Sequence, residues 1–215
     1  ASWYNITEIG QPIRIYIEGD GNAFNARGEP TTNPTPQSSF LREIAAQDPN
    51  MNVAYLGRPC QYIQTGNCSQ TDWTSGRFSQ QVIQSMNNAV KSLMKKAQTD
   101  KAVLIGYSGG AQIAGLIAVQ NPYISKVITI AGVLDTDAWV KHHGDTPLTN
   151  SINLKKYENQ FKKIPQIHYI GEKDSVVPIQ LTQQFISDKN KIIIVPKATH
   201  NKGFDSIYEH LYQEN

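Results

Sequence analysis

The sequence predicts an α/β fold in which a mostly parallel, twisted sheet has helices on both faces. Short apolar runs rich in β-branched residues alternate along the chain with longer segments whose apolar residues recur every three or four positions, as strands and helices do in such folds. A helical segment at residues 111–119 is apolar on every side, which is typical of a helix packed against the middle of a sheet. With 215 residues the chain is long enough for one well-buried domain and short for two, so residues 1–215 are predicted to form a single domain.

The first part of the chain predicts two strands, a helix and a further strand. Residues 3–9 form a candidate edge strand, and residues 13–18, rich in isoleucine, form the next strand and end at a turn of glycine, aspartate and asparagine. A short helix is expected at residues 40–45, after two serines that can cap it. The apolar run 53–56 predicts a buried strand.

The middle of the chain predicts a helix, a strand, a second helix and a second strand. Over residues 78–94 the apolar side chains recur at three- and four-residue spacing, which indicates a long amphipathic helix. Residues 101–105 form the next strand, and the apolar helix 111–119 follows almost at once. An Asn-Pro pair ends that helix, and residues 127–131 predict another strand.

The last part of the chain completes the alternation. Residues 136–150 read as an irregular stretch, and about thirty residues separate the strand before it from the strand after it. That length is too short for a large independent lid domain. The remaining predicted elements are a modest helix at 154–161, a strand at 167–170, a helix at 179–186, a strand at 191–195 and a closing helix at 204–211.

The segment from Gly106 to Gly110 carries the strongest functional signal. Its sequence, Gly-Tyr-Ser-Gly-Gly, follows an apolar strand and precedes an apolar helix, which is the setting of the G-x-S-x-G turn that exposes a nucleophilic serine at the carboxyl end of a sheet. At so tight a turn the residues two before and two after the serine come close together, and glycine avoids a collision of side chains. Ser108 is therefore the candidate nucleophile.

A serine hydroxyl becomes a good nucleophile when a base takes its proton and a third group orients the base. Asp174 and His200 each follow a predicted strand, in the chain order Ser, Asp, His. Because the carboxyl ends of parallel strands meet at one edge of the sheet, we expect both side chains beside Ser108. Asp135 and Asp137, which follow an earlier strand, are the alternative acids.

The other histidines and the tryptophans have competing interpretations. His168 lies inside a predicted strand, which is typical of a core residue, and His210 falls in the closing helix. Four further side chains are candidates for the mouth or walls of a substrate site and equally for surface and core positions: His142, His143, Trp73 and Trp139.

The composition excludes several classes of function. The formal net charge is +2, and no lysine or arginine cluster is longer than a pair, so we expect no nucleic-acid partner. No apolar run approaches the ~20 residues that cross a bilayer, and no histidine, cysteine and aspartate cluster has metal-ligand spacing. The turn at residues 19–21 lacks the third small residue of a dinucleotide fingerprint. A small-molecule substrate and chemistry without a cofactor or metal are expected, while the oligomeric state is not predicted.

Cys60 and Cys68 are the two cysteines of the chain and lie eight residues apart in a polar loop. A local disulfide is expected, with two free buried thiols as the alternative. A disulfide predicts an oxidising compartment and hence a secreted or periplasmic protein. The chain begins at Ala1 rather than methionine, which agrees with a removed export signal and equally with a trimmed chain.

From residue 13 onward the chain resembles a small member of the α/β-hydrolase family. The resemblance rests on the turn around Ser108, the Gly-Glu-Lys-Asp-Ser-Val-Val-Pro loop that holds Asp174, and the terminal loop that holds His200. It implies an α/β-hydrolase fold without a large lid domain. It also implies that Ser108 is the nucleophile, that His200 is the general base and then the general acid, and that Asp174 is the orienting carboxylate.

The resemblance further implies an oxyanion hole made of two backbone N–H groups. One belongs to the residue after the nucleophile, Gly109, and the other to the turn after an early strand, for which Asp20 is the candidate. Many relatives carry His-Gly where this chain has Glu18-Gly19. A hydrogen bond from Glu18 that braces this loop is an alternative role for the substituted position.

The activity implied by the resemblance is hydrolysis of carboxylic esters with small or medium acyl chains, through a Ser-His-Asp triad and an acyl-enzyme. Fold and triad do not fix the leaving group, so a thioesterase or a lipase-like acyl hydrolase on the same scaffold is an alternative. A non-catalytic binding protein that retains the fold is the alternative from another class.

Overall fold

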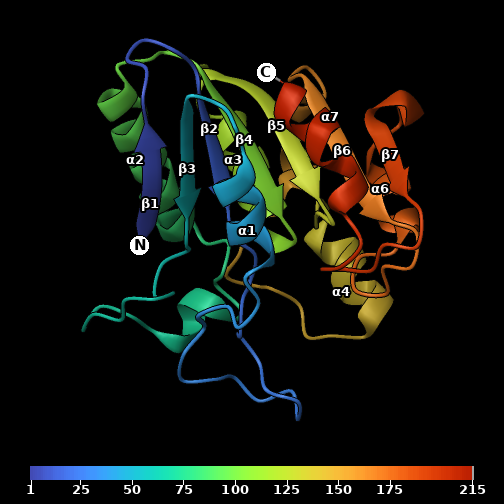
Figure 1. The fold of residues 1–215 in the computed structure, drawn as a ribbon. Coiled ribbons are helices and arrows are strands. Elements are labelled where there is room, and N and C mark those ends of the chain that lie inside the picture. Colours follow the sequence, from blue (N-terminus) through green and yellow to red (C-terminus); the bar gives the residue numbers. More distant parts are fainter. Residues whose placement is uncertain (215) are drawn as a thin grey trace.

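A computed structural model of the chain describes residues 1–214 and contains a seven-stranded sheet (Figure 1). The strands lie in the order β1-β3-β2-β4-β5-β6-β7. Every neighbouring pair is parallel except β1 and β3, which are antiparallel. Their bounds are β1 Ser2–Ile6, β2 Ile13–Ile17, β3 Asn52–Leu56, β4 Ala102–Tyr107, β5 Ile124–Ile130, β6 Gln166–Gly171 and β7 Ile192–Val195.

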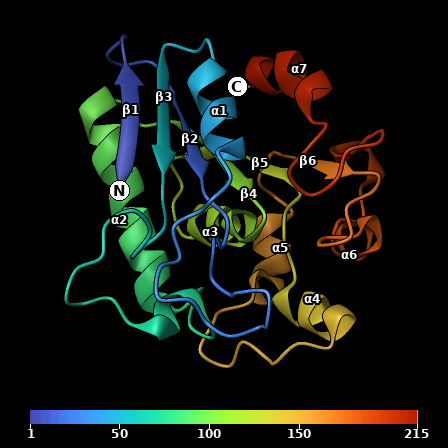
Figure 2. The ribbon, with the colours of Figure 1, turned by 60° about the horizontal axis from the view of Figure 1, so that its bottom comes forward.

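Helices cover both faces of the sheet, so the predicted fold class is confirmed. Apolar side chains of α2, α3, α5 and α6 belong to the core on one face, and those of α1 and α7 to the core on the other. Figure 2 shows α1 and α7 on one side of the strands and α3 and α5 on the opposite side. The helices are α1 Phe40–Gln47, α2 Gln80–Ala97, α3 Gly109–Ala118, α4 Thr136–His143, α5 Glu158–Phe161, α6 Ile179–Phe185 and α7 Tyr208–Gln213.

The inner strands are buried on both faces, as parallel strands between two helical layers must be. All five residues of β2 are buried, including Arg14, the second residue of the strand. A buried guanidinium needs partners, and Arg14 finds them in the Asp48 carboxylate, 2.7 Å from Nε, and in the Leu211 carbonyl, 2.7 Å from Nη2. These contacts attach the C-terminal helix α7 to the centre of the sheet.

The stretch 136–150 contains a helix that the sequence analysis did not predict. Helix α4 begins after Asp135, whose carboxylate accepts hydrogen bonds from the N–H groups of Asp137 and Ala138, each 3.1 Å long. It ends at Gly144, which has the left-handed φ of 69°. Only two of its residues are buried, so the helix carries little of the apolar periodicity on which the prediction relied. Within residues 1–214 no lid domain interrupts the fold, as expected.

Two long loops gather beyond the carboxyl ends of the strands, at the bottom of Figure 1. They connect β2 to α1 and β3 to α2. Cys60 and Cys68 form a disulfide in the second loop, which confirms the expected pairing. Cys60, Cys68 and Trp73 pack with Ala23 of the first loop in a small apolar cluster, so the two loops support each other. Among the helices of residues 1–214, none combines the length and the apolar character of a membrane span.

Candidate active site

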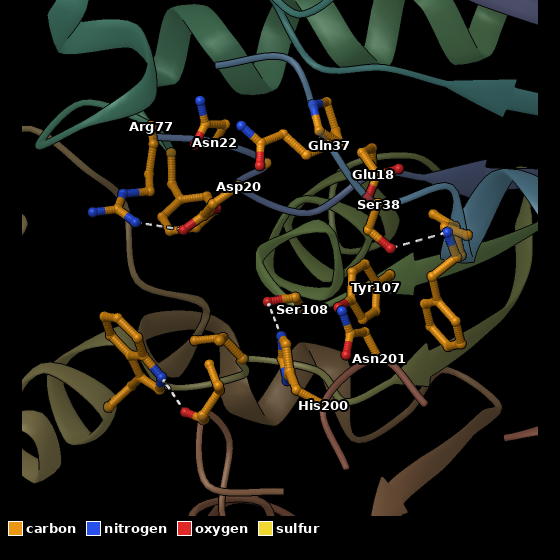
Figure 3. A pocket seen from close by; sticks show the side chains of 18 of the residues that line it. Glu18, Asp20, Asn22, Gln37, Ser38, Arg77, Tyr107, Ser108, His200 and Asn201 are labelled. Atoms are coloured by element: carbon orange, nitrogen blue, oxygen red, sulfur yellow. Dashed lines mark hydrogen bonds and ion pairs between the residues drawn. The ribbon is translucent and has the colours of Figure 1, made fainter. Parts of the chain in front are cut away.

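Ser108 occupies a strained turn between β4 and α3. Its backbone has φ 50° and ψ −122°, a conformation that residues other than glycine rarely adopt. A Cβ atom at Gly106 would lie 2.5 Å from the carbonyl oxygen of Gly110, and one at Gly110 would lie 2.2 Å from the carbonyl oxygen of Ile17. Glycine is therefore required at both positions. At Gly106 the reason is the expected close approach of Gly110, whereas at Gly110 it is contact with the backbone at the end of β2. The turn points the serine side chain into a cavity at the carboxyl edge of the sheet (Figure 3).

The structure brings Ser108, His200 and Asp174 together. The Nε2 atom of His200 lies 3.0 Å from Ser108 Oγ, and its Nδ1 atom lies 2.9 Å from Asp174 Oδ2. The imidazole ring thus bridges the hydroxyl and the carboxylate, and Figure 3 shows its contact with Ser108. The three residues follow β4, β7 and β6, so the parallel topology is what assembles them.

The Asp174 carboxylate is fully buried and fully engaged. While Oδ2 receives the histidine, Oδ1 accepts hydrogen bonds from the N–H groups of Val176 and Val177, both 2.8 Å long. These bonds leave the carboxylate a single orientation toward the ring of His200. An imidazole held in this way keeps its Nδ1–H toward the acid and its Nε2 lone pair toward the serine.

The alternative acids, Asp135 and Asp137, lie at the start of α4. Asp135 caps the helix and accepts a hydrogen bond of 2.8 Å from the side chain of Asn153. Asp137 lies in the first turn of the same helix. Neither carboxylate is hydrogen-bonded to His200, so the geometry favours Asp174 as the partner of the imidazole.

Two of the other histidines, His168 and His210, are hydrogen-bonded away from Ser108. The ring of His168 is fully buried and lies 2.8 Å from Thr129 Oγ1 and 3.0 Å from Gln166 Oε1. It is a satisfied core residue, as predicted, and burial lowers its pKa to about 3. His210 lies in α7, where its Nδ1 is 2.6 Å from the hydroxyl of Tyr169.

Of the other candidates for the mouth and walls, Trp139 lines the cavity that contains Ser108. Its Nε1–H donates to the carbonyl of Val176 across 2.8 Å, and His143 Nε2 lies 2.9 Å from the same oxygen. Both contacts fasten α4 to the loop that holds the buried acid. Trp73 does not line this cavity but packs against Cys60 and donates to the carbonyl of Thr31. His142 does not line the cavity either and contacts the ring of His143 edge to face.

Of the two proposed oxyanion donors, Asp20 lines the cavity, and Gly109 directly follows Ser108, which lines it too. Neither the N–H of Gly109 nor that of Asp20 has a hydrogen-bond acceptor within residues 1–214. Glu18 accepts the N–H of Gly19 at 2.8 Å and the hydroxyl of Tyr55, which confirms that Glu18 braces this loop. Burial raises the pKa of Glu18, although these two hydrogen bonds act in the opposite direction.

Two arginines that the sequence analysis overlooked hold the carboxylate of Asp20. Arg58 Nη1 binds one oxygen and Arg77 Nη1 binds the other. Burial would raise the pKa of Asp20, but the two guanidinium charges outweigh it and lower that pKa. Arg58 lies two residues beyond β3, so its place at the carboxyl edge of the sheet was the signal that could have identified it.

The cavity around Ser108 has a volume of about 350 Å³. Its lining is mixed, with aromatic and aliphatic side chains beside polar ones (Figure 3). The apolar lining comes from Phe40, Leu41, Phe78, Val133, Trp139, Leu148 and Val176, and the polar lining includes Asn22, Gln37, Ser38 and Asn201. A hollow of about 450 Å³ between β1, β3 and α1 contains none of the predicted catalytic residues. Within residues 1–214 no three histidine, cysteine, aspartate or glutamate side chains are placed to hold a metal ion.

Residues 37–201 match the family of serine hydrolases described as FSH1. This segment includes Ser108, Asp174 and His200 but begins after Asp20. Among curated proteins, none matches the sequence significantly.

Solved structures of esterases share the fold. The chain is similar to Est1E of Butyrivibrio proteoclasticus with bound ferulic acid, at a TM-score of 0.71 and 13% identity, covering 99% of this chain and 91% of that one. An esterase of Pyrococcus furiosus has a TM-score of 0.63 and 17% identity, with coverage of 93% and 78%. The esterase domain of a Rhodothermus marinus protein has a TM-score of 0.63 and 16% identity, with coverage of 97% and 88%. At these identities the likeness extends to the fold alone.

Proposed function

The chain belongs to the serine hydrolase (FSH1) family, and from this premise we propose that it cleaves carboxylic esters of small or medium acyl chains. The observation that carries the proposal is the unbroken series of hydrogen bonds from Ser108 through His200 to Asp174, with lengths of 3.0 and 2.9 Å. This series lies in a cavity with room for a small ester. A serine, a base and an orienting acid in this arrangement can perform acyl transfer without further groups.

The reaction proceeds in two halves. His200 Nε2 takes the proton of Ser108 as Oγ attacks the ester carbonyl, and the imidazolium then gives that proton to the departing alkoxide. The alcohol leaves, and the acyl group stays on Oγ. Water then attacks the acyl-enzyme with His200 again as the base, and the carboxylic acid is released as the serine regains its proton. Asp174 holds Nδ1–H and stabilises the transient positive ring throughout.

The tetrahedral intermediates carry negative charge on the former carbonyl oxygen. We assign its stabilisation to the N–H groups of Gly109 and Asp20, which have no other acceptor within the described chain. Gly109 is the first residue of α3, a helix of ten residues, and the positive end of the helix dipole favours an anion there. For comparison, a single side-chain donor in an oxyanion hole typically stabilises the transition state by about 3 kcal/mol.

The size of the cavity supports the choice of substrate. A volume of about 350 Å³ is at the lower end of the range for small-molecule sites, and the described residues contain no lid domain to extend it. Aromatic side chains in the lining, among them Phe40 and Trp139, suit flat acyl groups as well as short aliphatic ones. Because Est1E is described with bound ferulic acid, a ferulate ester belongs among the substrates to be tried.

A fluorophosphonate probe with peptide mapping tests the catalytic assignment. We expect one label, on the peptide that contains Ser108, and no label on a Ser108→Ala variant. Ser38→Ala is the matched control, because Ser38 also lines the cavity but its hydroxyl accepts the N–H of Phe40 and is hydrogen-bonded to no histidine of the described chain. This variant is expected to label normally. Absence of label on folded wild-type protein would favour the non-catalytic binding protein.

Nitrophenyl esters of increasing acyl length test the substrate class. Turnover is expected to be highest for chains of a few carbons and to fall for long ones, with methyl ferulate and an acyl thioester in the same panel. A preference for chains beyond about ten carbons would contradict a site of this volume and favour the lipase-like alternative. Faster turnover of the thioester than of its oxygen ester would favour a thioesterase.

We also propose that the protein works in an oxidising compartment, outside the cytoplasm. The disulfide between Cys60 and Cys68 supports this location, since such bonds persist in oxidising surroundings. Titration of thiols in denaturant on freshly isolated protein tests it. No free thiol is expected, and two would contradict the proposal.

A further inference from the structure

The side chains of Arg58, Asp20 and Arg77 take no part in the mechanism above, yet their ion cluster adjoins the predicted oxyanion donors. A Cβ atom built on Gly109 would lie 2.1 Å from Asp20 Oδ1 and 3.2 Å from Arg58 Nη1. The carboxylate and one guanidinium are therefore packed directly against the residue that follows the nucleophile. Figure 3 shows Asp20 and Arg77 pointing toward one another across the end of the cavity.

Further contacts fix the side chains of both arginines. Arg58 Nη2 donates to the carbonyl of Arg77, and its guanidinium lies 5.0 Å from the ring centre of Phe78. Arg77 Nε donates to the carbonyl of Thr74 at 2.7 Å. The two side chains are only 4% and 7% exposed. They can thus fix the position of the Asp20 carboxylate, and through it the backbone of residue 20.

The charges of the cluster do not cancel. Two guanidinium groups share one carboxylate, while the nearby Glu18 bonds to Gly19 and Tyr55 and to neither arginine. A positive excess beside a partly desolvated site acts strongly on charge that develops there. A lone carboxylate against Gly109 would instead oppose an oxyanion.

We propose that Arg58 and Arg77 are positioning residues of the oxyanion hole. They hold Asp20 so that its backbone N–H and that of Gly109 face the same substrate oxygen, and they offset the negative charge of the Asp20 side chain at that point. The inference rests on the proposed function, because it assigns a role in stabilising the oxyanion of that same reaction. It predicts an effect on the transition state rather than on ester binding.

Arg77→Met and Asp20→Asn test the inference on the full chain. With nitrophenyl butyrate we expect kcat to fall about 10- to 100-fold in each, less than for loss of a direct donor, and KM to change less than about threefold. Affinity for a trifluoromethyl ketone, which mimics the tetrahedral intermediate, is expected to fall by the same factor as kcat/KM. Affinity for butyramide, a neutral analogue of the ground state, is expected to stay the same. Arg77→Lys keeps the charge and is expected to restore part of kcat.

The control is Arg27→Met, which removes an arginine from an exposed part of the neighbouring loop and is expected to leave kcat unchanged. Thermal unfolding identifies any variant that fails to fold, in which case Arg77→Lys and Arg58→Lys carry the test. Unchanged kcat in folded Arg77→Met would overturn the inference. It would also be overturned by a loss confined to KM for esters that bear a carboxylate, which would make Arg77 a substrate-binding residue.

Failure of the proposed function is distinguishable from failure of this inference. If wild-type protein takes no fluorophosphonate label on Ser108, the proposed function fails and the inference fails with it. If wild type is labelled and hydrolyses esters while Arg77→Met and Asp20→Asn do so at the same rate, only the positioning role of the cluster is wrong.

Discussion

The carboxylate of Asp20 occupies the space that a side chain at Gly109 would need. An added Cβ atom would come within 2.1 Å of Asp20 Oδ1, far inside van der Waals contact. The last two glycines of the Gly-Tyr-Ser-Gly-Gly turn therefore have different reasons to be glycine. Gly110 allows the turn to pack against the backbone of β2, whereas Gly109 makes room for a charged side chain of a separate loop.

Gly109→Ala is expected to lower activity sharply. The new methyl group must displace a carboxylate that Arg58 and Arg77 hold from two sides, so the loop at residue 20 has to shift. We expect kcat for nitrophenyl butyrate to fall at least tenfold, because small displacements of catalytic groups have large kinetic effects. Stopped assays at saturating ester measure this loss.

The control for this substitution is Gly66→Ala, at an exposed glycine of the disulfide loop whose added Cβ would meet nothing within 4 Å. That variant is expected to keep wild-type kcat. Wild-type kcat in folded Gly109→Ala would mean that the loop at Asp20 can move without effect on catalysis.

Asp174→Asn tests which carboxylate orients the imidazole. An amide in place of the carboxylate favours the wrong tautomer of His200, and at the equivalent position of other serine hydrolases this costs about 10⁴-fold in kcat. We expect a loss of about 10³- to 10⁴-fold here, measured with excess protein and a nitrophenyl ester. The overall fold is expected to survive, because asparagine has the same shape.

Asp135→Ala provides the matched comparison. It removes the cap of α4, for which a cost of about 1 kcal/mol in the free energy of unfolding is expected, with kcat within a few-fold of wild type. The opposite pattern, severe loss of activity in Asp135→Ala and little in Asp174→Asn, would return the alternative acid to the catalytic role.

The sequence allowed the fold to be predicted because its strongest signals are local. The apolar runs of the inner strands and the periodicity of α2 persist in the structure with shifts of only a few residues. Helix α4 was missed for the opposite reason. It depends on the capping carboxylate of Asp135 and on contacts of Trp139 with the carbonyl of Val176, and neither produces an apolar period.

In the candidate site, too, some residues could be predicted from the sequence and others could not. Ser108, Asp174 and His200 each stand at the end of a strand, so parallel topology alone predicts that they meet. The association of Asp20 with Arg58 and Arg77 joins the β2–α1 loop to both ends of the β3–α2 loop, and no sequence pattern encodes how these two loops pack. The resemblance points to residue 20 only for its backbone N–H, and nothing in the sequence indicates that two guanidinium groups hold its side chain.

Removal of the disulfide is expected to affect both stability and activity. The loop it closes carries Gln61, whose Nε2 donates to the carbonyl of Gly19 at 2.9 Å and whose Oε1 accepts the N–H of Arg58 at 2.8 Å. A Cys60→Ser/Cys68→Ser variant should therefore lose about 2.5 kcal/mol of unfolding free energy by the loop-entropy account. Its kcat should also fall several-fold, because Gly19 and Arg58 lose a rigid support.

Urea unfolding and ester turnover measure the two effects. Dithiothreitol should reproduce both in wild type and add nothing to the double variant, which serves as the control for non-specific action of the reductant. Full activity of the reduced wild-type protein would show that the loop keeps its place without the bond.

His168 is a buried titratable group away from the catalytic side chains. Its Nε2 faces Gln166 Oε1, which only accepts, and its Nδ1 faces the hydroxyl of Thr129, which can donate. This pair of partners suits a neutral ring. Burial, with a smaller contribution from the charge of Lys191, lowers the pKa of His168 from 6.5 to about 3.

Stability is therefore expected to fall as the pH drops below about 6.5. Between that value and the folded pKa of about 3, the unfolded chain binds a proton at His168 that the folded protein does not, so each pH unit lowers the unfolding free energy by up to about 1.4 kcal/mol. Above about pH 6.5 both states are neutral and this contribution vanishes. Urea unfolding at pH 7.5, 6.5, 5.5 and 5.0 measures how steeply the unfolding free energy changes with pH. The His168→Gln variant should lose the contribution of up to about 1.4 kcal/mol per pH unit, whatever its absolute stability. An unaltered slope in His168→Gln would mean that His168 is protonated in the folded protein.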